Sequence, residues 1–336
     1  MHRRRAGTPG WAACTPTGRI RPPPPCCDGV QLRGVNRSGT QYACVLGPEV
    51  FDGPADDASI RAMTSWGINA VRVSLNEQCW LGVNGLPVEY SAEHYRTEVV
   101  GYVDRLLAAG LAVIVDLHWS APGAEQARGQ KRMADRDHAP QFWRSVAATF
   151  RGHRAVVFDL YNEPYPDFRD PEAAWRCVRD GGDCPGVDFV AAGMQELVDA
   201  VRSTGATNPV MVAGPEYAGV LDRWLDHRPH DPLGQLVASI HVYGPDESPC
   251  WTEECWDDTI APLADQVPVV IGEMGNTDCT TTLIDPLMTW ADDRDVGYLA
   301  WAWVPSDCAA EPALITDFTG APTPYGAGLR DHLGSR

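Results

Sequence analysis

Two kinds of segment alternate along this chain, and each has its own spacing of apolar residues. Short apolar runs have the length and composition of buried strands. Between them lie longer segments whose apolar residues recur every three or four positions, which indicates helices with one buried face. Tyr95, Val99 and Tyr102 share one face of the clearest helix. Ser91 can cap its start and Gly110 can end it.

Eight strand–helix units result from this pattern. The predicted strands are residues 31–36, 69–75, 111–117, 155–163, 209–213, 236–241, 269–275 and 297–301. The predicted helices are residues 56–65, 91–110, 141–150, 189–201, 220–225, 257–264, 283–290 and 325–333. Strands that are apolar on both faces and separated by helices form a parallel sheet. Eight of them predict an α/β fold of the (β/α)8 TIM-barrel type, as a single domain.

An open, doubly wound sheet is the alternative architecture. It would carry a glycine-rich phosphate loop after its first strand, and residues 34–37 do not form one. A barrel acting on phosphorylated metabolites would bind phosphate after its seventh and eighth strands. Residues 275–277 and 304–306 do not supply such a site.

The first 29 residues differ from the rest. They begin with a basic stretch, but no apolar segment follows it, so no signal peptide is evident. Residues 22–25 are four consecutive prolines. We therefore predict a disordered, proline-rich lead over residues 1–29 and a barrel domain over residues 30–336.

Composition limits the partners. The chain has 336 residues and a net charge of −18, which argues against nucleic acid or an anionic membrane surface as a partner. No apolar stretch is long enough to span a membrane. A neutral polymer remains compatible with this charge, and we expect a monomer without cofactors.

The cysteines indicate an oxidising compartment. Of the 11, Cys14, Cys26 and Cys27 lie in the lead, which leaves eight in the barrel domain. We predict disulfides that staple its loops, although buried free thiols are the alternative. The predicted pairs are Cys44–Cys79, Cys177–Cys184, Cys250–Cys255 and Cys279–Cys308. Disulfides are typical of secreted proteins, so we expect an extracellular location.

Polar and aromatic residues gather at the carboxyl ends of the predicted strands, where barrels place their active sites. They are Asn36, Arg37, Arg72, Asn76, Glu77, His118, Trp119, Asn162, Glu163, His241, Tyr243, Glu273, Trp301 and Trp303. Two carboxylates that face each other suit glycoside cleavage, because one can protonate the leaving oxygen while the other attacks the sugar carbon. Arg72 and Tyr243 would keep Glu273 ionised. His241 could orient Glu163.

These residues, in this order, resemble glycoside hydrolase family 5, the family of retaining cellulases and mannanases. The resemblance covers residues 31–333 and identifies the barrel as a catalytic domain. It implies that Glu163 is the general acid/base and Glu273 the nucleophile. The surrounding residues that it implies are Arg72, His118, Asn162, His241, Tyr243 and Trp303.

The remaining site predictions concern aromatic side chains and metals. We expect Trp303 in the cleft and Trp301 in the core, and we regard Asn36, Trp119 and Trp80 as possible sugar subsites. A metal held by His118 and His241 is not expected, because the first strand lacks a His-x-His pair.

The resulting functional hypothesis is an endo-β-1,4-glucanase acting on oligo- or polysaccharide by double displacement. The alternatives within the family are a β-mannanase, a β-1,3-glucanase or another β-glycosidase. A barrel that binds carbohydrate without cleaving it is an alternative from a different class. It would normally lack one of the two carboxylates, and both are present.

Overall fold

A computed structural model describes residues 30–47, 49–86, 91–245 and 247–335. The predicted disordered lead, with its three cysteines, lies outside these residues. Within them, eight strands form a closed parallel barrel in the order β1-β10-β9-β8-β7-β4-β3-β2. The barrel strands are β1 (Arg33–Arg37), β2 (Ala70–Asn76), β3 (Ala112–Trp119), β4 (Val156–Asp159), β7 (Val210–Ala213), β8 (Leu236–Val242), β9 (Val269–Met274) and β10 (Gly297–Ala300). The predicted TIM barrel is confirmed.

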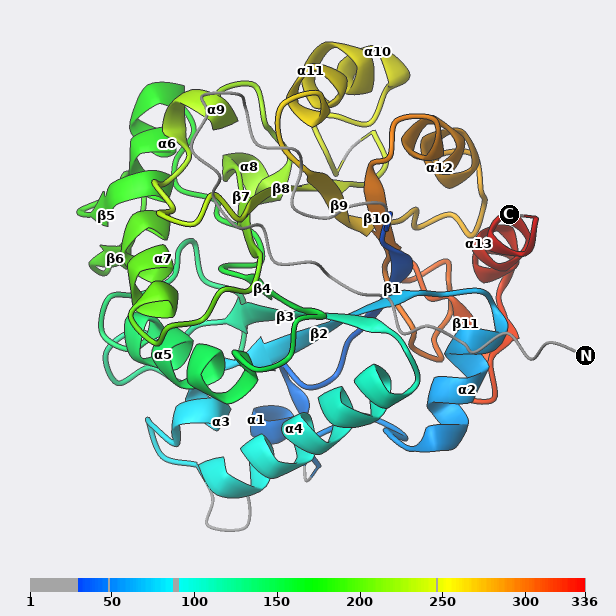
Figure 1. Cartoon of the computed structure of the whole chain (residues 1–336), viewed down its shortest axis with the longest axis horizontal. Coiled ribbons are helices and arrows are strands. Elements are labelled where there is room, and N and C mark those ends of the chain that lie inside the picture. Colours follow the sequence, from blue (N-terminus) through cyan, green and yellow to red (C-terminus); the bar gives the residue numbers. More distant parts are fainter. Residues whose placement is uncertain (1–29, 48, 87–90, 246, 336) are drawn as a thin grey trace, which may run out of the picture.

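Helices surround the strands as an outer ring (Figure 1). The helices that match predicted ones are α2 (Asp57–Ser65), α4 (Ala92–Ala108), α5 (Ala139–Phe150), α7 (Met194–Arg202), α9 (Trp224–His227), α12 (Ile284–Asp292) and α13 (Pro324–Gly334). The predicted helix 257–264 is part of a continuous stretch made of α10 (Glu253–Cys255), η2 (Trp256–Ile260) and α11 (Ala261–Ala264). Ser91 caps α4 by accepting a hydrogen bond from the His94 amide, as predicted.

Several short elements were not predicted. They are α1 (Ala43–Leu46), α3 (Glu77–Leu81), α6 (Pro171–Asp180), α8 (Pro215–Ala218), the pair β5 (Gly181–Gly182) and β6 (Ala191–Ala192), and the pair β11 (Ile315–Asp317) and β12 (Ala321–Pro322). The helix expected from residue 189 begins only at Met194, because Ala191 and Ala192 pair with β5 instead. The helix expected from residue 220 begins at Trp224.

Alternation along the strands separates two apolar regions. Val71, Val73 and Leu75 of β2 face outward and join the large core beneath the helices. The inner cluster consists of Leu32, Ala70, Ala112, Ile114, Val157, Met211, Val237, Val270 and Leu299. It fills the barrel near the strands' amino-terminal ends, so the polar residues that follow on the same inward faces lie near the carboxyl-terminal mouth.

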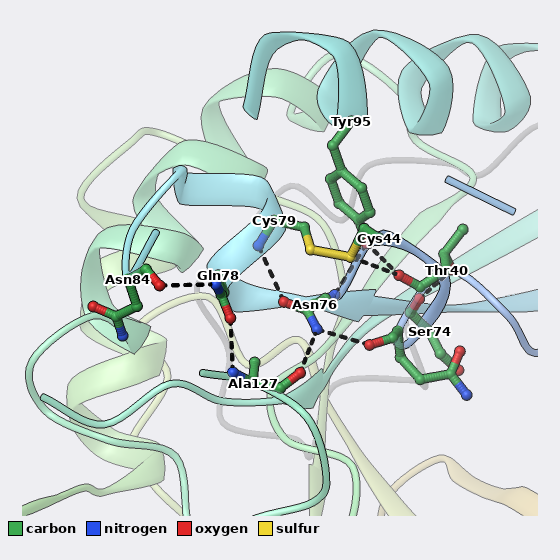
Figure 2. Close-up of a disulfide and its surroundings, with 10 residues drawn as sticks. Thr40, Cys44, Ser74, Asn76, Gln78, Cys79, Asn84, Tyr95 and Ala127 are labelled. Atoms are coloured by element: carbon green, nitrogen blue, oxygen red, sulfur yellow. Dashed lines mark hydrogen bonds between the residues drawn. A yellow bond between two sulfur atoms is a disulfide. The ribbon is translucent and has the colours of Figure 1, made fainter. Parts of the chain in front are cut away.

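All four predicted disulfides are present: Cys44–Cys79, Cys177–Cys184, Cys250–Cys255 and Cys279–Cys308. Cys44–Cys79 joins α1 to α3, which follow the neighbouring strands β1 and β2 (Figure 2). The bridges therefore staple loops onto the barrel, as predicted. Among the described helices, none has the length and apolar character needed to cross a membrane.

Candidate active site

Arg72 is the centre of the polar mouth. It lies in β2 and is fully buried. Its guanidinium reaches five acceptors, namely Glu273 at 2.7 Å, Asn162 at 2.8 Å, Asn36 at 3.0 Å, Asp159 at 3.0 Å and Asp116 at 3.2 Å. Burial disfavours the guanidinium charge, but Asp116 and Asp159 outweigh it and raise the pKa of Arg72. A permanent cation in β2 therefore links residues of β1, β3, β4 and β9 and the segment directly after β4.

Glu273 projects from β9 and is held from two sides. Its Oε1 accepts from Arg72, and its Oε2 accepts from the Tyr243 hydroxyl at 2.6 Å. The predicted contacts of Arg72 and Tyr243 with Glu273 are therefore both present. Burial and the nearby negative charge of Glu273 raise the pKa of Tyr243 well above its ordinary value, so the phenol keeps its proton and remains a donor.

Glu163 follows β4 and has a more open position. Its side chain is 17% exposed, compared with 4% for Glu273. His241 Nδ1 donates to Glu163 Oε1 at 2.8 Å, and Gln130 Nε2 donates to Oε2 at 3.0 Å. Burial opposes ionisation of Glu163, but the hydrogen bond and charge of His241, with the bond from Gln130, outweigh it and lower its pKa.

His241 lies between the two glutamates. Besides its bond to Glu163, its Nδ1 is 3.6 Å from Glu273 Oε2. Burial alone would lower the pKa of His241, but the charge of Glu273 and the bond to Glu163 raise it. Oxygen atoms of the two carboxylates lie within 4.8 Å of each other. The predicted pair of carboxylates therefore meets at one end of the barrel.

His118 and a tryptophan form another wall of the site. The His118 imidazole donates through Nδ1 to Asp116 at 2.8 Å. The ring of Trp301 stacks on His118 with centroids 5.6 Å apart and an interplanar angle of 17°. Trp301 is half-buried, so it contributes an accessible aromatic ring beside the polar cluster.

The placement of Trp301 and Trp303 corrects the sequence prediction. Trp303 is fully buried and packs edge-on against Trp66 at a centroid distance of 4.7 Å, so it does not line the cleft. We expected the chain to turn outward there, but the Trp303 amide bonds to the Asn36 carbonyl, and the chain still runs beside β1. The core and cleft tryptophans are therefore the reverse of those expected.

Two of the three possible subsites are also wrong. Trp80 has no exposed surface, and its indole N–H donates a hydrogen bond to the hydroxyl of Ser145 on α5. Asn36 is buried as well, with its amide donating to the Gly272 carbonyl and its oxygen accepting from Arg72. Neither has a group free for a sugar.

Trp119, the third possible subsite, is partly exposed. Its ring centroid lies 6.2 Å from that of Tyr42. The structure thus leaves Trp119 as a candidate contact for sugar at the mouth.

Sequence reasoning missed three residues of this cluster. Asp116 and Asp159 are buried carboxyl groups next to Arg72, and burial raises the pKa of Asp159 to about 6 against the opposing effect of the guanidinium. Their signal was a single aspartate inside an otherwise apolar strand. Gln130, in the loop after β3, had no comparable signal, because loop residues carry no periodicity.

Among the described residues, Glu163, His241 and Glu273 have the spacing of a metal-binding group. The carboxylate oxygens of the two glutamates already accept hydrogen bonds from Arg72, Tyr243, His241 and Gln130. Each carboxylate is therefore held in place by protein hydrogen-bond donors.

Comparison with known proteins identifies the family. The model of the family described as cellulase (glycosyl hydrolase family 5) matches residues 27–307. This chain belongs to glycosyl hydrolase family 5. The expected family 5 resemblance is thereby confirmed over most of the chain.

Relatives of this family 5 chain have distant sequences. A β-mannanase/endoglucanase A of Caldicellulosiruptor saccharolyticus is 25% identical over 264 residues, covering 74% of this chain and 17% of that protein. An endoglucanase of Halalkalibacter akibai is 22% identical over 293 residues, covering 81% of this chain and 33% of that protein. The chain thus spans a third or less of these two relatives.

Solved structures share the family 5 fold. A mutant endo-β-1,4-glucanase of Xanthomonas axonopodis pv. citri has a TM-score of 0.69 at 19% identity, with 91% of this chain and 100% of that chain covered. A β-mannanase of Streptomyces thermolilacinus has a TM-score of 0.63 at 23% identity, with 91% of each chain covered. These likenesses support the barrel architecture.

Proposed function

We propose that this family 5 chain is a retaining endo-β-1,4-glucanase, with Glu163 as general acid/base and Glu273 as nucleophile. The observation that carries the proposal is the spacing of the two carboxylates, whose oxygen atoms lie within 4.8 Å. Retaining glycosidases have carboxyl groups about 5–5.5 Å apart, whereas inverting enzymes need roughly 6.5–9.5 Å to admit water. The presence of an endo-β-1,4-glucanase among its relatives favours a β-1,4-glucan as substrate.

The first step forms a covalent glycosyl-enzyme. A carboxylate oxygen of Glu273 attacks the anomeric carbon while the bond from that carbon to the leaving sugar's oxygen breaks. The leaving oxygen takes a proton from Glu163. Glu163 must carry that proton before the step, and the imidazolium form of His241, whose Nδ1 lies 2.8 Å from Glu163 Oε1, can supply it and remain as neutral imidazole.

The second step releases the product. Glu163, now ionised, removes a proton from water, and the hydroxide oxygen bonds to the anomeric carbon as the ester bond to Glu273 breaks. Arg72 and Tyr243 stabilise the carboxylate as it departs, because both bonds strengthen as its negative charge returns. Trp301 offers an aromatic ring on which a sugar can stack.

The four disulfides support an oxidising location. We therefore propose that the enzyme acts outside the cell on an oligo- or polysaccharide.

Replacement of each glutamate tests the proposed roles. Glu273→Ala should abolish turnover of soluble β-1,4-glucan, because no other group can form the ester. Glu163→Ala should abolish turnover of natural glucan as well. Glu247→Ala is the control, because Glu247 is an exposed loop carboxylate, and it should leave activity unchanged. Near-normal activity of the Glu273 variant would contradict the assignment.

A substrate panel tests the specificity. The wild-type enzyme should release products from cellulose faster than from mannan, xyloglucan or laminarin. Faster release from mannan would replace the glucanase assignment with the β-mannanase alternative.

A further inference from the structure

Gln130 contacts the proposed acid/base from the side opposite His241. Its Nε2 lies 3.0 Å from both Glu163 Oε2 and the Glu163 carbonyl oxygen. Its Oε1 accepts from Asn162 Nδ2 at 3.3 Å. The carboxamide thus uses both its donor and its acceptor on two consecutive residues of the active site. No other side-chain type of this length offers both groups without a charge.

The loop that carries Gln130 is anchored to α3. Asn76 Nδ2 donates to the Ala127 carbonyl at 2.9 Å, and the Ala127 amide donates to Gln78 Oε1 at 2.8 Å (Figure 2). Cys79, next to Gln78, is tied to α1 by its disulfide. The backbone is therefore fixed at Ala127, and Gln130, three residues further along the loop, reaches Glu163 from this supported position.

A second anchor lies beyond Gln130. The Tyr161 hydroxyl donates to the Lys131 carbonyl at 2.6 Å, and Tyr161 is itself buried two residues before Glu163. The loop is thus bound to the same segment that carries the acid/base, which limits movement of the carboxamide relative to the carboxyl.

We propose that Gln130 is a positioning residue, which fixes the orientation of the Glu163 carboxyl and controls when it carries its proton. This inference rests on the proposed function, in which Glu163 is the acid/base. With His241 on one oxygen and Gln130 on the other, the carboxyl plane cannot rotate without breaking a bond. Proton transfer to the leaving oxygen requires such a fixed plane.

Removal of the amide should have two consequences. The carboxyl gains rotational freedom, so protonation of a poor leaving group slows, whereas a leaving group that needs no proton is unaffected. In addition, the bond from Gln130 lowers the pKa of Glu163, so its loss raises that pKa. Because the acid form must be present for the first step, the alkaline limb of the pH profile should move to higher pH.

The test compares Gln130→Met with Gln126→Met. Both variants change glutamine to methionine in the same loop. Gln126, however, is exposed, and its side chain accepts a hydrogen bond from Arg128 instead of contacting Glu163. The substrates are cellotetraose, whose leaving sugar needs a proton, and 2,4-dinitrophenyl β-cellobioside, whose phenolate does not. For Gln130→Met we expect kcat/KM on cellotetraose to fall about tenfold or more, as part of the roughly 10²–10⁴-fold effect of general acid catalysis.

The same variant should retain kcat/KM on the dinitrophenyl substrate within about threefold, with its alkaline limb for cellotetraose shifted to higher pH. Gln126→Met should match the wild type in both respects. Equal losses on the two substrates, or an unchanged alkaline limb, would overturn the positioning role and leave a structural one.

A second variant covers the case in which Gln130→Met does not fold. Gln130→Glu has the same shape and places a carboxylate beside Glu163, which raises the pKa of Glu163 further and should move the alkaline limb in the same direction. An unmoved limb in this variant would also overturn the inference. Failure of the proposed function is distinguishable, because the wild-type enzyme would then hydrolyse neither substrate.

Discussion

Arg72→Lys is the most informative single replacement, because Arg72 holds the carboxylate of Glu273, the proposed nucleophile, against the barrel. Its guanidinium serves five acceptors in a site with no solvent exposure. A lysine ammonium has three N–H donors, so at least two acceptors lose their partner. Each unsatisfied buried acceptor costs about 1–3 kcal/mol, so we expect a loss of about 2–6 kcal/mol in the free energy of unfolding.

The activity should fall as well. A hydrogen bond to a charged group contributes about 1.5–3 kcal/mol. Loss of the 2.7 Å bond to Glu273 would therefore lower kcat/KM by roughly 10- to 100-fold. Urea unfolding measures the first effect, and initial rates on cellopentaose measure the second.

Arg202→Lys is the matched control. Arg202 lies on α7 and makes paired bonds to Asp231 at 2.8 and 2.9 Å, away from the mouth of the barrel. This variant should lose stability while kcat/KM of the folded enzyme stays unchanged. The reasoning would be refuted if Arg72→Lys kept its unfolding free energy within 1 kcal/mol of the wild type and its kcat/KM within about threefold.

Three further predictions follow from the structure. Because its ring is buried, Trp303→Ala should lower the free energy of urea unfolding by about 3–5 kcal/mol, whereas Trp301→Ala should mainly lower kcat/KM. The reverse pattern would restore the expectation that Trp303 lines the cleft and Trp301 lies in the core. The raised pKa of Asp159, about 6, makes its contribution to stability present below about pH 4 and lost as pH rises through 6. The stability of the wild type relative to Asp159→Asn should therefore decrease between pH 4 and 7, and a constant difference in urea unfolding would contradict this. Replacing both Cys44 and Cys79 by alanine removes a disulfide that joins residues 35 positions apart and should lower the free energy of unfolding by about 3–4 kcal/mol. An unchanged melting temperature would contradict this prediction.

The barrel was predictable because its strands are apolar on both faces and its helices have a separate periodicity. Glycine made one close strand contact possible, since a Cβ at Gly34 would lie 1.9 Å from the Ala70 carbonyl oxygen. Short elements such as α3 and α6 were missed because they lie in loops, where tertiary contacts decide the local conformation. The helix α6, for example, starts where Asp170 caps it and Pro171 opens it.

The site was predictable where chemistry coincides with a strand end. Glu163 and Glu273 follow directly from that rule, whereas Arg72 was marked by its charge within a largely apolar strand. The two tryptophans were exchanged because alternation stops at Ala300, where β10 ends, and the irregular chain beyond it follows no period. Gln130 was missed because its role depends on a loop returning to the barrel, and such long-range contacts are not visible in a local pattern.

The anomeric configuration of the first product tests the central claim most directly. Proton NMR during the first minutes of cellopentaose hydrolysis distinguishes the two anomers before they equilibrate. Two carboxylates this close together predict that the new reducing end appears first as the β-anomer, through two successive displacements. Initial formation of the α-anomer would contradict the assignment of Glu273 as a nucleophile.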